Sequence, residues 1–241
     1  MPSYRPVPAQ PDHPALEHAI LELWERERTF ERLVEARQGG TPFSFTDGPI
    51  TANNPMGVHH AWGRSLKDLF QRYQAGLGKE LRYQNGFDCQ GLWVEVEVEK
   101  ALGLNSKREI EEYGLDRFAR ACRDRVAEYS AVQARQSRRL GQWMRWDASY
   151  YTMTDPNIDY IWRFLAVCNE KGWLYVGHRP MVWCPRCGTS LSQHELIDSY
   201  RDVTHLSIYA TLALADAPDE HLVVWTTTPW TLPANYAIAY Q

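Results

Sequence analysis

The stretch from Phe43 to Asp68 constrains this chain most, because it reads as a strand, a loop and the start of a helix. Its first four residues alternate aromatic and small polar side chains, which is typical of a short buried strand. Asp47-Gly48-Pro49 then breaks the alternation, and an amphipathic helical run begins near Val58. Unpaired backbone N–H groups at a helix start attract anions, and His59 and His60 lie on this first turn. The pattern predicts a phosphate site, and an ordinary strand–helix connection with two surface histidines is the alternative.

The composition is that of a globular protein: 241 residues, 44% hydrophobic, 23% charged, with ten Trp. A formal charge of −4 argues against a generally basic nucleic-acid binder. A large anionic partner could still dock on a local arginine patch, although a solvated helix face explains the same residues, Arg135, Arg138, Arg139 and Arg145. With no apolar run near 18 residues, no secretion signal and an odd number of cysteines, we expect a cytoplasmic protein without a membrane partner.

Periodicity predicts an α/β chain. We expect helices over residues 15–37, 58–74, 106–112, 115–141 and 157–171, and strands at 43–46, 81–83, 203–213 and 222–225. Asp88 follows the second strand, and ligands of a doubly wound sheet bind beyond the carboxyl ends of its strands. Asp88 and the loop before Gly57 are therefore expected to face one crevice, where a carboxylate can hold a substrate ammonium. A turn-forming aspartate is the alternative.

Cys184-Pro185-Arg186-Cys187 forms a tight turn that can aim two thiolates at one cation. Two ligands cannot saturate tetrahedral zinc, so we predict a half-site. A redox pair or a metal-free loop stays open, and His178 or His194 is a weaker candidate for a further ligand.

The central stretch resembles the nucleotide-binding motif of class I aminoacyl-tRNA synthetases, in which a Pro/Gly-rich loop leads into His-x-Gly-His and then a helix with Lys-Asp. Asp47-Gly48-Pro49, Thr51-Ala52-Asn53, His60, Lys67 and Asp68 fall in register with it. The resemblance implies the first half of a Rossmann-like nucleotide-binding domain, with His59 and His60 as catalytic residues. It also implies that ATP, with Mg, is bound by Thr51, Asn53, Gly57, His59 and His60.

The match departs from the family at Gly57-Val58-His59-His60, where the usual first His and the usual Gly have exchanged places. Side chains two positions apart on a helix point about 200° away from one another. We therefore expect His59 to reach the usual first-His place only through a backbone shift. Because both residue types are present in swapped places, we interpret the exchange as a compensated, active rearrangement.

A second block, Asn85 to Glu95, resembles the isoleucine-specific branch of this family. The resemblance implies that Asp88 binds the amino group of the amino acid and that Gly48 and Pro49 line its side-chain pocket. Gln90 and Trp93 depart from the usual His and Pro. Valine and leucine enzymes carry different residues at this block, and they remain the alternative within the class.

Two further blocks lie near the C-terminal end of the sequence. The cysteine turn resembles the junction between the nucleotide-binding core and an inserted domain, whose second cysteine pair would come from beyond Gln241. The run from Thr226 to Asn235 resembles the threonine-rich peptide of the proofreading domain, although clustered β-formers explain it equally. The resemblance implies that the misacylated 3′-terminal adenosine is contacted by Thr226, Thr227, Thr228 and Asn235.

These blocks divide the chain into a helical extension (1–40), half of the catalytic domain (41–182), a zinc-knuckle junction (183–198) and the start of a β-rich editing domain (199–241). Residues 235–241 read as an unfinished strand, so we expect the N-terminal portion of a longer, monomeric isoleucine-tRNA ligase that is inactive as 241 residues alone. The implied reaction is ATP-dependent activation of isoleucine, its transfer to tRNA(Ile) and hydrolysis of Val-tRNA(Ile). A non-catalytic paralogue that binds tRNA or a synthetase is the alternative.

Overall fold

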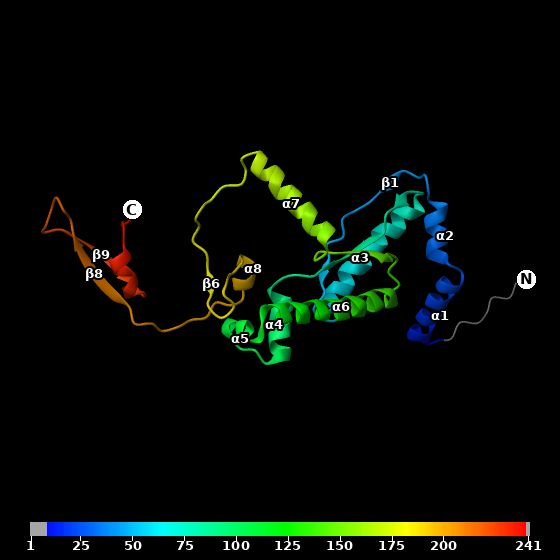
Figure 1. The fold of residues 1–241 in the computed structure, drawn as a ribbon, viewed down its shortest axis with the longest axis horizontal. Helices are drawn as coiled ribbons and strands as arrows, with labels where there is room; N and C mark the ends of the chain where they lie inside the picture. Colours follow the sequence, from blue (N-terminus) through cyan, green and yellow to red (C-terminus); the bar gives the residue numbers. More distant parts are fainter. Residues whose placement is uncertain (1–8, 240–241) are drawn as a thin grey trace, which may run out of the picture. The chain divides into compact units, whose positions relative to one another are not determined.

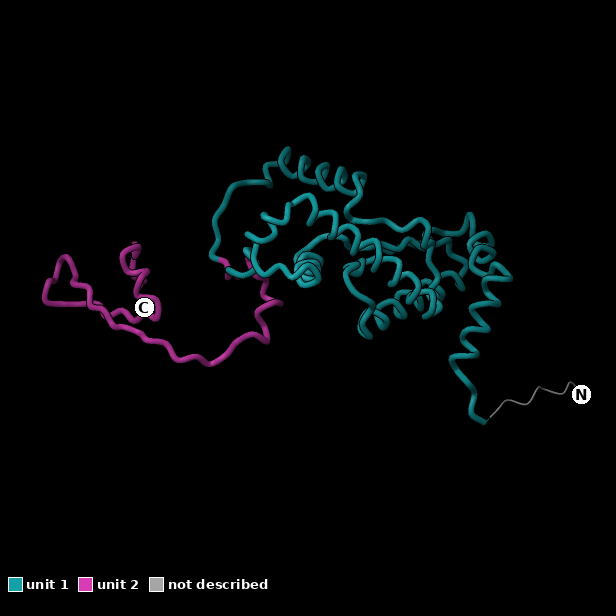
Figure 2. Tube along the Cα trace, turned by 60° about the horizontal axis from the view of Figure 1, so that its bottom comes forward, with its two compact units in different colours: residues 1–180, 185–188 teal, residues 181–184, 189–241 magenta. Residues whose placement is uncertain are grey.

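The computed structural model describes residues 9–239, and the chain divides into two compact units. The first unit comprises residues 1–180 and 185–188, and the second comprises residues 181–184 and 189–241 (Figure 2). Residues 1–8 of the N-terminal extension and residues 240–241 of the expected last strand lie outside the described part. Within residues 9–239, no helix combines the length and apolarity that a membrane span requires.

The N-terminal extension forms two helices, where the periodicity predicted one. Helix α1 (His13–Arg26) begins at Asp12, whose side chain accepts a hydrogen bond from the Ala15 N–H at 3.1 Å. The chain breaks at Arg28, which adopts the left-handed conformation (φ 49°), and α2 (Thr29–Ala36) follows. The prediction was wrong here because apolar spacing continues across the break and does not report one residue's backbone angle.

A three-stranded parallel sheet in the order β2-β4-β5 lies at the centre of the first unit. Its strands are β2 (Ile50–Thr51), β4 (Gln84–Asp88) and β5 (Arg145–Tyr151). A short parallel pair joins β1 (Pro42–Phe43), which is labelled in Figure 1, to β3 (Glu80–Leu81). Helical crossovers connect these parallel strands, which confirms the α/β class. At Gly86 the Tyr150 ring approaches so closely that a Cβ would overlap it.

Two predicted strands differ in extent from the observed ones. The strand expected over residues 43–46 ends at Phe43, and the chain pairs again only at Ile50. The strand expected over residues 81–83 ends at Leu81, because Tyr83 is left-handed (φ 54°), and β4 then carries the chain to Asp88. Asp88 is the last residue of a strand, so its position at a carboxyl strand end is confirmed.

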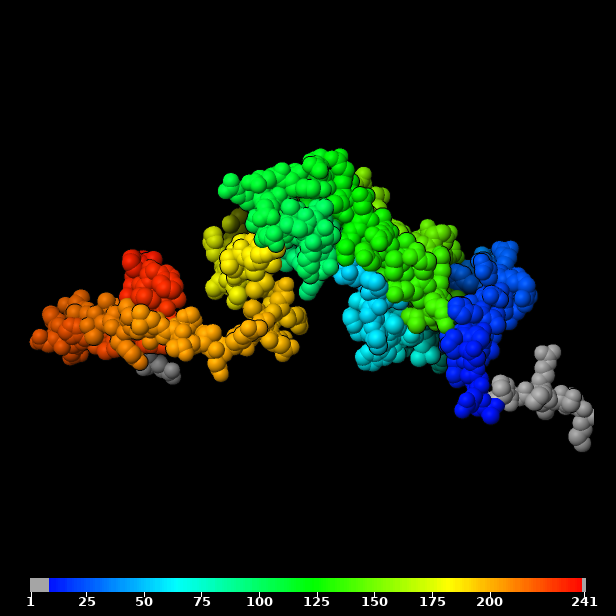
Figure 3. Space-filling model, turned by 90° about the horizontal axis from the view of Figure 1, so that it is seen from below, coloured from blue at the N-terminus to red at the C-terminus, as the bar shows by residue number. Residues whose placement is uncertain are grey.

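Five helices follow β2 within the first unit. The predictions are confirmed for α3 (Val58–Gly76), α5 (Lys107–Tyr113), α6 (Leu115–Arg139) and α7 (Asp155–Glu170). Helix α4 (Leu92–Leu102) was not predicted, since its alternating Val and Glu residues have the period of a strand. In Figure 3 the surfaces of α6 and α1 adjoin, and Arg139 pairs there with Glu17 at 2.8 Å.

Buried apolar residues hold these helices to the strands. One cluster joins the ends of β2 and β4 to α4 and α6 through Ala52, Phe87, Cys89, Val94 and Val126. A second joins α2 and α3 to β3 through Ala75, Leu81, Tyr83 and Met144, with Phe30, Leu33 and Val34 packed against it. The aromatic residues around β5 that were predicted as core are half-buried: Trp143, Trp146, Tyr150 and Tyr151.

The second unit contains two antiparallel hairpins. Strand β6 (Trp183–Cys184) pairs with β7 (Thr189–Ser190), and β8 (Ile208–Ala213) pairs with β9 (His221–Thr226). A short helix α8 (Gln193–Leu196) and a 3₁₀ helix η1 (Pro229–Ala234) complete it. The strand predicted at residues 222–225 is confirmed as part of β9, but the prediction that it is buried is wrong, since Trp225 is 59% exposed. Its apolar residues alternate in exposure along a two-stranded hairpin.

Candidate nucleotide and amino-acid site

The last residues of β2 and β4 bring the two predicted substrate sites together. Thr51 lies opposite Asp88 in the parallel register, and the Ala52 N–H donates to the Asp88 carbonyl at 2.8 Å. The Thr51 hydroxyl donates to the Asp88 carboxylate at 2.9 Å. This contact orients one carboxylate oxygen of the half-buried Asp88 at the carboxyl edge of the sheet, where ligands of such folds bind.

Residues 52–57, which we name the nucleotide loop, connect β2 to the N-terminus of α3. The Gly57 N–H donates to His60 Nδ1 at 3.1 Å, which requires that nitrogen to be unprotonated. Burial lowers the pKa of His60, and the neighbouring His59 and Arg64 lower it further. His60 is therefore held neutral beside the free N–H groups of the helix start, while Asn53 lies half-buried within the loop.

The exchanged motif has a specific geometry. A Cβ on Gly57 would lie 2.8 Å from His59 Cε1, so the exposed His59 ring folds back over Gly57. A side chain at position 59 thus reaches the space beside the Cβ position of residue 57. Gly57 is the N-cap with extended backbone (φ −77°, ψ 168°), and helical angular spacing does not apply to a residue outside the helix.

The Asp47-Gly48-Pro49 turn is fixed from two sides. The buried Asp47 carboxylate accepts from the Gly86 N–H at 3.1 Å and forms an ion pair with Lys67. Lys67 also donates to the Gly48 carbonyl at 2.9 Å. Gly48 is exposed and Pro49 is half-buried, so both can border a bound side chain while Lys67 holds the turn.

Sequence reasoning missed the polar residues that hold these loops from within. Arg64 is 1% exposed and donates to Asn85 Oδ1 at 2.9 Å, beneath the first turns of α3. Gln133 and Gln136 on α6 bond to the backbone of residues 51–56. A glutamine within the apolar side of a long helix was the available signal, because such a residue needs buried partners.

The turn after Asp88 is anchored on Thr152. The Cys89 N–H donates to the Thr152 hydroxyl at 2.9 Å, and the Gln90 amide donates to the Thr152 carbonyl at 3.0 Å. A mostly apolar cavity of about 320 Å³ opens beside this turn, between α4, α6 and α7, and Cys89 and Cys122 both line it. Gln90, one of the two departures from the family block, thus supports the position of the strand end.

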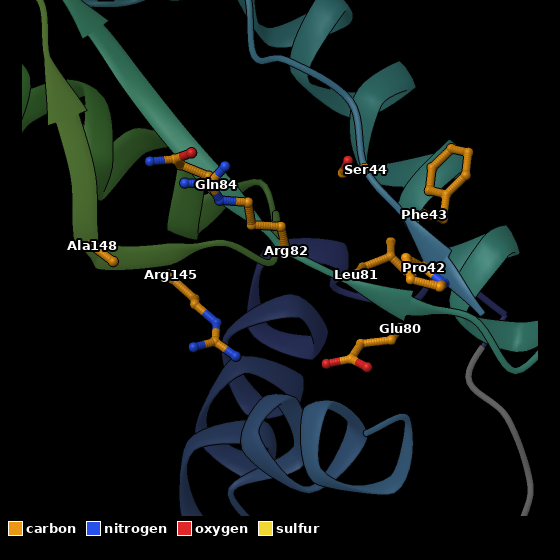
Figure 4. A pocket seen from close by; sticks show the side chains of 9 residues that line it. All are labelled: Pro42, Phe43, Ser44, Glu80, Leu81, Arg82, Gln84, Arg145 and Ala148. Carbon is orange, nitrogen blue, oxygen red and sulfur yellow. The ribbon is translucent and has the colours of Figure 1, made fainter. Parts of the chain in front are cut away.

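A separate cavity of about 560 Å³ lies at the opposite end of the strands. Figure 4 shows its lining, in which Glu80 and Arg145 project from β3 and β5. In the central sheet, the lining residues Gln84 and Arg145 begin β4 and β5, whereas substrates of doubly wound sheets bind at strand carboxyl ends. The Thr51–Asp88 edge is therefore the candidate for a substrate site. The predicted arginine patch is partly engaged, since Arg145 lines this cavity and Arg139 pairs with Glu17.

The remaining predicted residues belong to residues 178–187 of the chain or to the second unit. Cys184 ends β6 and Cys187 lies in the turn before β7, and both are half-buried, whereas His178 and His194 are exposed. Among residues 9–239, no three or more His, Cys, Asp or Glu side chains form a group that could hold a metal ion. Arg186, between the two cysteines, donates to the buried Glu99 at 3.0 Å.

The threonine run follows β9 directly. The Thr228 N–H donates to the Thr226 hydroxyl at 3.0 Å, so these two residues form a local turn around Thr227. Thr226 and Thr227 are half-buried, while Thr228 and Asn235 are exposed. Three hydroxyls therefore lie at the end of one hairpin, and Asn235 follows at the end of η1.

Comparisons with known proteins agree with the motifs. The family described as tRNA synthetases class I (I, L, M and V) matches residues 19–233. The chain is 41% identical to the isoleucine–tRNA ligase of Cutibacterium acnes over 239 residues, and 42% identical to those of Streptomyces coelicolor over 241 and Thermus thermophilus over 235. These alignments cover 98%, 99% and 95% of this chain but only 22%, 23% and 22% of those proteins.

A solved structure shares the fold. It is the ternary complex of the Agrobacterium radiobacter K84 agnB2 LeuRS with tRNA and LeuAMS, which matches with a TM-score of 0.56 at 18% identity. The match covers 79% of this chain and 22% of that one. Because the family match extends over most of the sequence, the chain belongs to the class I tRNA synthetases of the isoleucine, leucine, methionine and valine group.

Proposed function

We propose that the chain is the N-terminal portion of an isoleucine-tRNA ligase. The isoleucine carboxylate attacks the α-phosphorus of ATP, the bond to pyrophosphate breaks, and isoleucyl-adenylate forms. A ribose hydroxyl of the tRNA terminal adenosine then attacks the activated carbonyl and releases AMP. In such phosphoryl chemistry a protein mainly positions the reactants and stabilises charge.

The observation that carries this proposal is the hydrogen bond from Thr51 to Asp88. It joins the end of the nucleotide loop to the carboxylate that would bind the substrate ammonium. A charge-assisted contact to Asp88 would orient the isoleucine carboxylate toward the start of α3. Both substrates would then meet at one edge of the sheet.

The neighbouring groups take the roles that this geometry supports. The phosphates of ATP, with Mg, would lie at the N-terminus of α3, beside His59, His60 and Gly57, with Thr51 and Asn53 bordering the nucleotide. Gly48 and Pro49 would border the isoleucine side chain. A neutral His60 can accept a hydrogen bond at one ring nitrogen while the other donates to a phosphate oxygen.

The rest of the chain would serve the longer protein. We propose an extension over residues 1–40, half of the catalytic domain over 41–182, a knuckle over 183–198 and the start of an editing domain over 199–241. Cys184 and Cys187 would supply half of a zinc site. Thr226, Thr227, Thr228 and Asn235 would contact mischarged tRNA, since one methylene discriminates valine by only about 10- to 200-fold and a second sieve is needed. The protein would act as a cytoplasmic monomer.

Isoleucine-dependent ATP–pyrophosphate exchange by the full-length protein tests the site. Asp88→Asn should lower kcat/KM for isoleucine by roughly 10- to 150-fold, the value of a hydrogen bond to a charged group, and should leave the KM for ATP near wild type. Asp124→Asn, an exposed change on α6, is the matched control. Unchanged isoleucine kinetics in Asp88→Asn would remove Asp88 from the site.

A further inference from the structure

Helix α6 contacts the nucleotide loop through a row of polar side chains that no motif singled out. The Gln133 amide nitrogen donates to two backbone carbonyls, those of Thr51 at 3.0 Å and Asn54 at 2.9 Å. Three residues further along α6, Gln136 Oε1 accepts from the Met56 N–H at 2.8 Å. Each of these contacts reaches the loop backbone, so none depends on the loop's own side chains.

The two carbonyls that Gln133 binds flank the first turn of the nucleotide loop. One amide group bonded to both therefore closes that turn. Gln133 is 1% exposed, and its amide oxygen is buried without a protein partner among the described residues. A buried amide in this setting carries a cost that apolar packing alone would not require. The two hydrogen bonds that the Gln133 amide donates to the loop backbone offset this cost.

The same loop leads into both substrate sites. Thr51, whose hydroxyl donates to Asp88, directly precedes the loop. The last residue of the loop is Gly57, whose N–H donates to His60. The Thr51 end is also held by the β2–β4 ladder through the Ala52 N–H. The part between Asn53 and Met56 has no such ladder, so the contacts from α6 hold it, including one from Arg125 to the Asn54 side chain at 3.0 Å.

We propose that Gln133, supported by Gln136, is a positioning residue that holds the nucleotide loop in its ATP-binding conformation. This inference rests on the proposed function, because it assigns the loop to ATP. Removing the Gln133 amide loosens the first turn of the loop, between Thr51 and Asn54, and leaves Asp88 paired with the ladder. We therefore expect the binding of ATP to weaken and the binding of isoleucine to stay unchanged.

The test uses the full-length protein with Gln133→Met, which keeps the side-chain length and removes the amide. Two lost hydrogen bonds predict a roughly 5- to 30-fold rise in the KM for ATP in pyrophosphate exchange, with the KM for isoleucine within about twofold of wild type. Gln136→Met removes one contact from a half-buried position and should give a smaller rise. Glu128→Gln, exposed on the same helix, is the control.

Hydrogen exchange by mass spectrometry supplies a readout independent of catalysis. Faster exchange confined to peptides covering residues 52–57, in Gln133→Met and in Gln136→Met, supports the proposal. If hydrogen exchange rises uniformly through the first unit, or if the KM values for ATP and for isoleucine increase equally, Gln133 supports only the stability of the unit. Either result overturns the proposal. If the wild-type protein shows no isoleucine-dependent ATP–pyrophosphate exchange, while hydrogen exchange in residues 52–57 still rises in the variants, the proposed function fails. The role of Gln133 in holding the loop then stands without it.

Discussion

A double-mutant cycle on Gly57 and His59 tests whether the exchanged motif is one compensated unit. The perturbations are Gly57→Ala, His59→Gly and their combination. An added Cβ at Gly57 would lie 2.8 Å from His59 Cε1 and 3.0 Å from Nδ1, well inside ordinary van der Waals contact. The backbone angles of Gly57 suit any residue, so the only obstacle to a side chain there is the His59 ring.

The expected loss of stability in Gly57→Ala depends on how the His59 ring can move. His59 is exposed and can swing away, but it then leaves His60, whose ring centroid lies 3.9 Å from its own. Losing an aromatic contact of this kind costs about 0.5–1.5 kcal/mol. Gly57→Ala should therefore destabilise the wild-type background by about 1 kcal/mol and should cost almost nothing once His59 is glycine.

Urea unfolding of the four proteins measures the free energies, with ATP KM values of the full-length forms beside them. The reversion Gly57→His with His59→Gly should also raise the affinity of an adenylate-mimicking inhibitor, because it removes the bulk of the ring from position 59, the place of the usual Gly. If the two single changes add within about 0.3–0.5 kcal/mol, the residues are independent and the compensation is refuted.

Three further outcomes are expected. Because burial, His59 and Arg64 lower the pKa of His60 in the folded protein, its contribution to stability is present above about pH 6.5 and is lost as the pH falls below that value. Thermal unfolding between pH 7.5 and 5.5 should show this loss, and His60→Gln should reduce it. Burial, with Glu95 and Glu99, raises the pKa of Cys122 to about 11. Peptide mapping after iodoacetamide treatment at pH 8 should find Cys122 alkylated roughly a hundredfold more slowly than free cysteine, and equal rates would contradict the burial. In the full-length protein, Thr227→Ala with Asn235→Ala should leave isoleucine activation intact and let Val-tRNA(Ile) accumulate. Unchanged deacylation of Val-tRNA(Ile) would mean that the threonine run is only part of a strand and has no role in editing.

The sequence predicted the order of strand, loop and helix and the start of α3, because these elements differ in period and in their Gly and Pro residues. It did not predict strand β2, and it placed the strand before Asp88 at residues 81–83 and not at β4. The position of Asp88 at a carboxyl strand end needed only that pattern and a parallel sheet. The direct hydrogen bond from Thr51 needed more, since it depends on a register that pairs Thr51 with Asp88. Strand periodicity alone leaves that register open.

Other features of the fold and of the candidate site escaped prediction for three physical reasons. The break at Arg28 rests on one backbone angle within an uninterrupted apolar pattern. The His59 ring reaches Gly57 because the N-cap lies outside the helix, where periodicity gives no direction. Gln133 acts across 79 to 82 positions of sequence, and no local pattern reports such a contact.

Amino-acid selectivity in ATP–pyrophosphate exchange by the full-length protein tests the central claim most directly. Isoleucine should support exchange, and valine should support it with a kcat/KM lower by about 10- to 200-fold, the limit of one methylene. Preference for valine or leucine would contradict the assignment to isoleucine. A full-length protein that binds tRNA but shows no exchange with any of the three amino acids would contradict the activating role of the Thr51–Asp88 site itself.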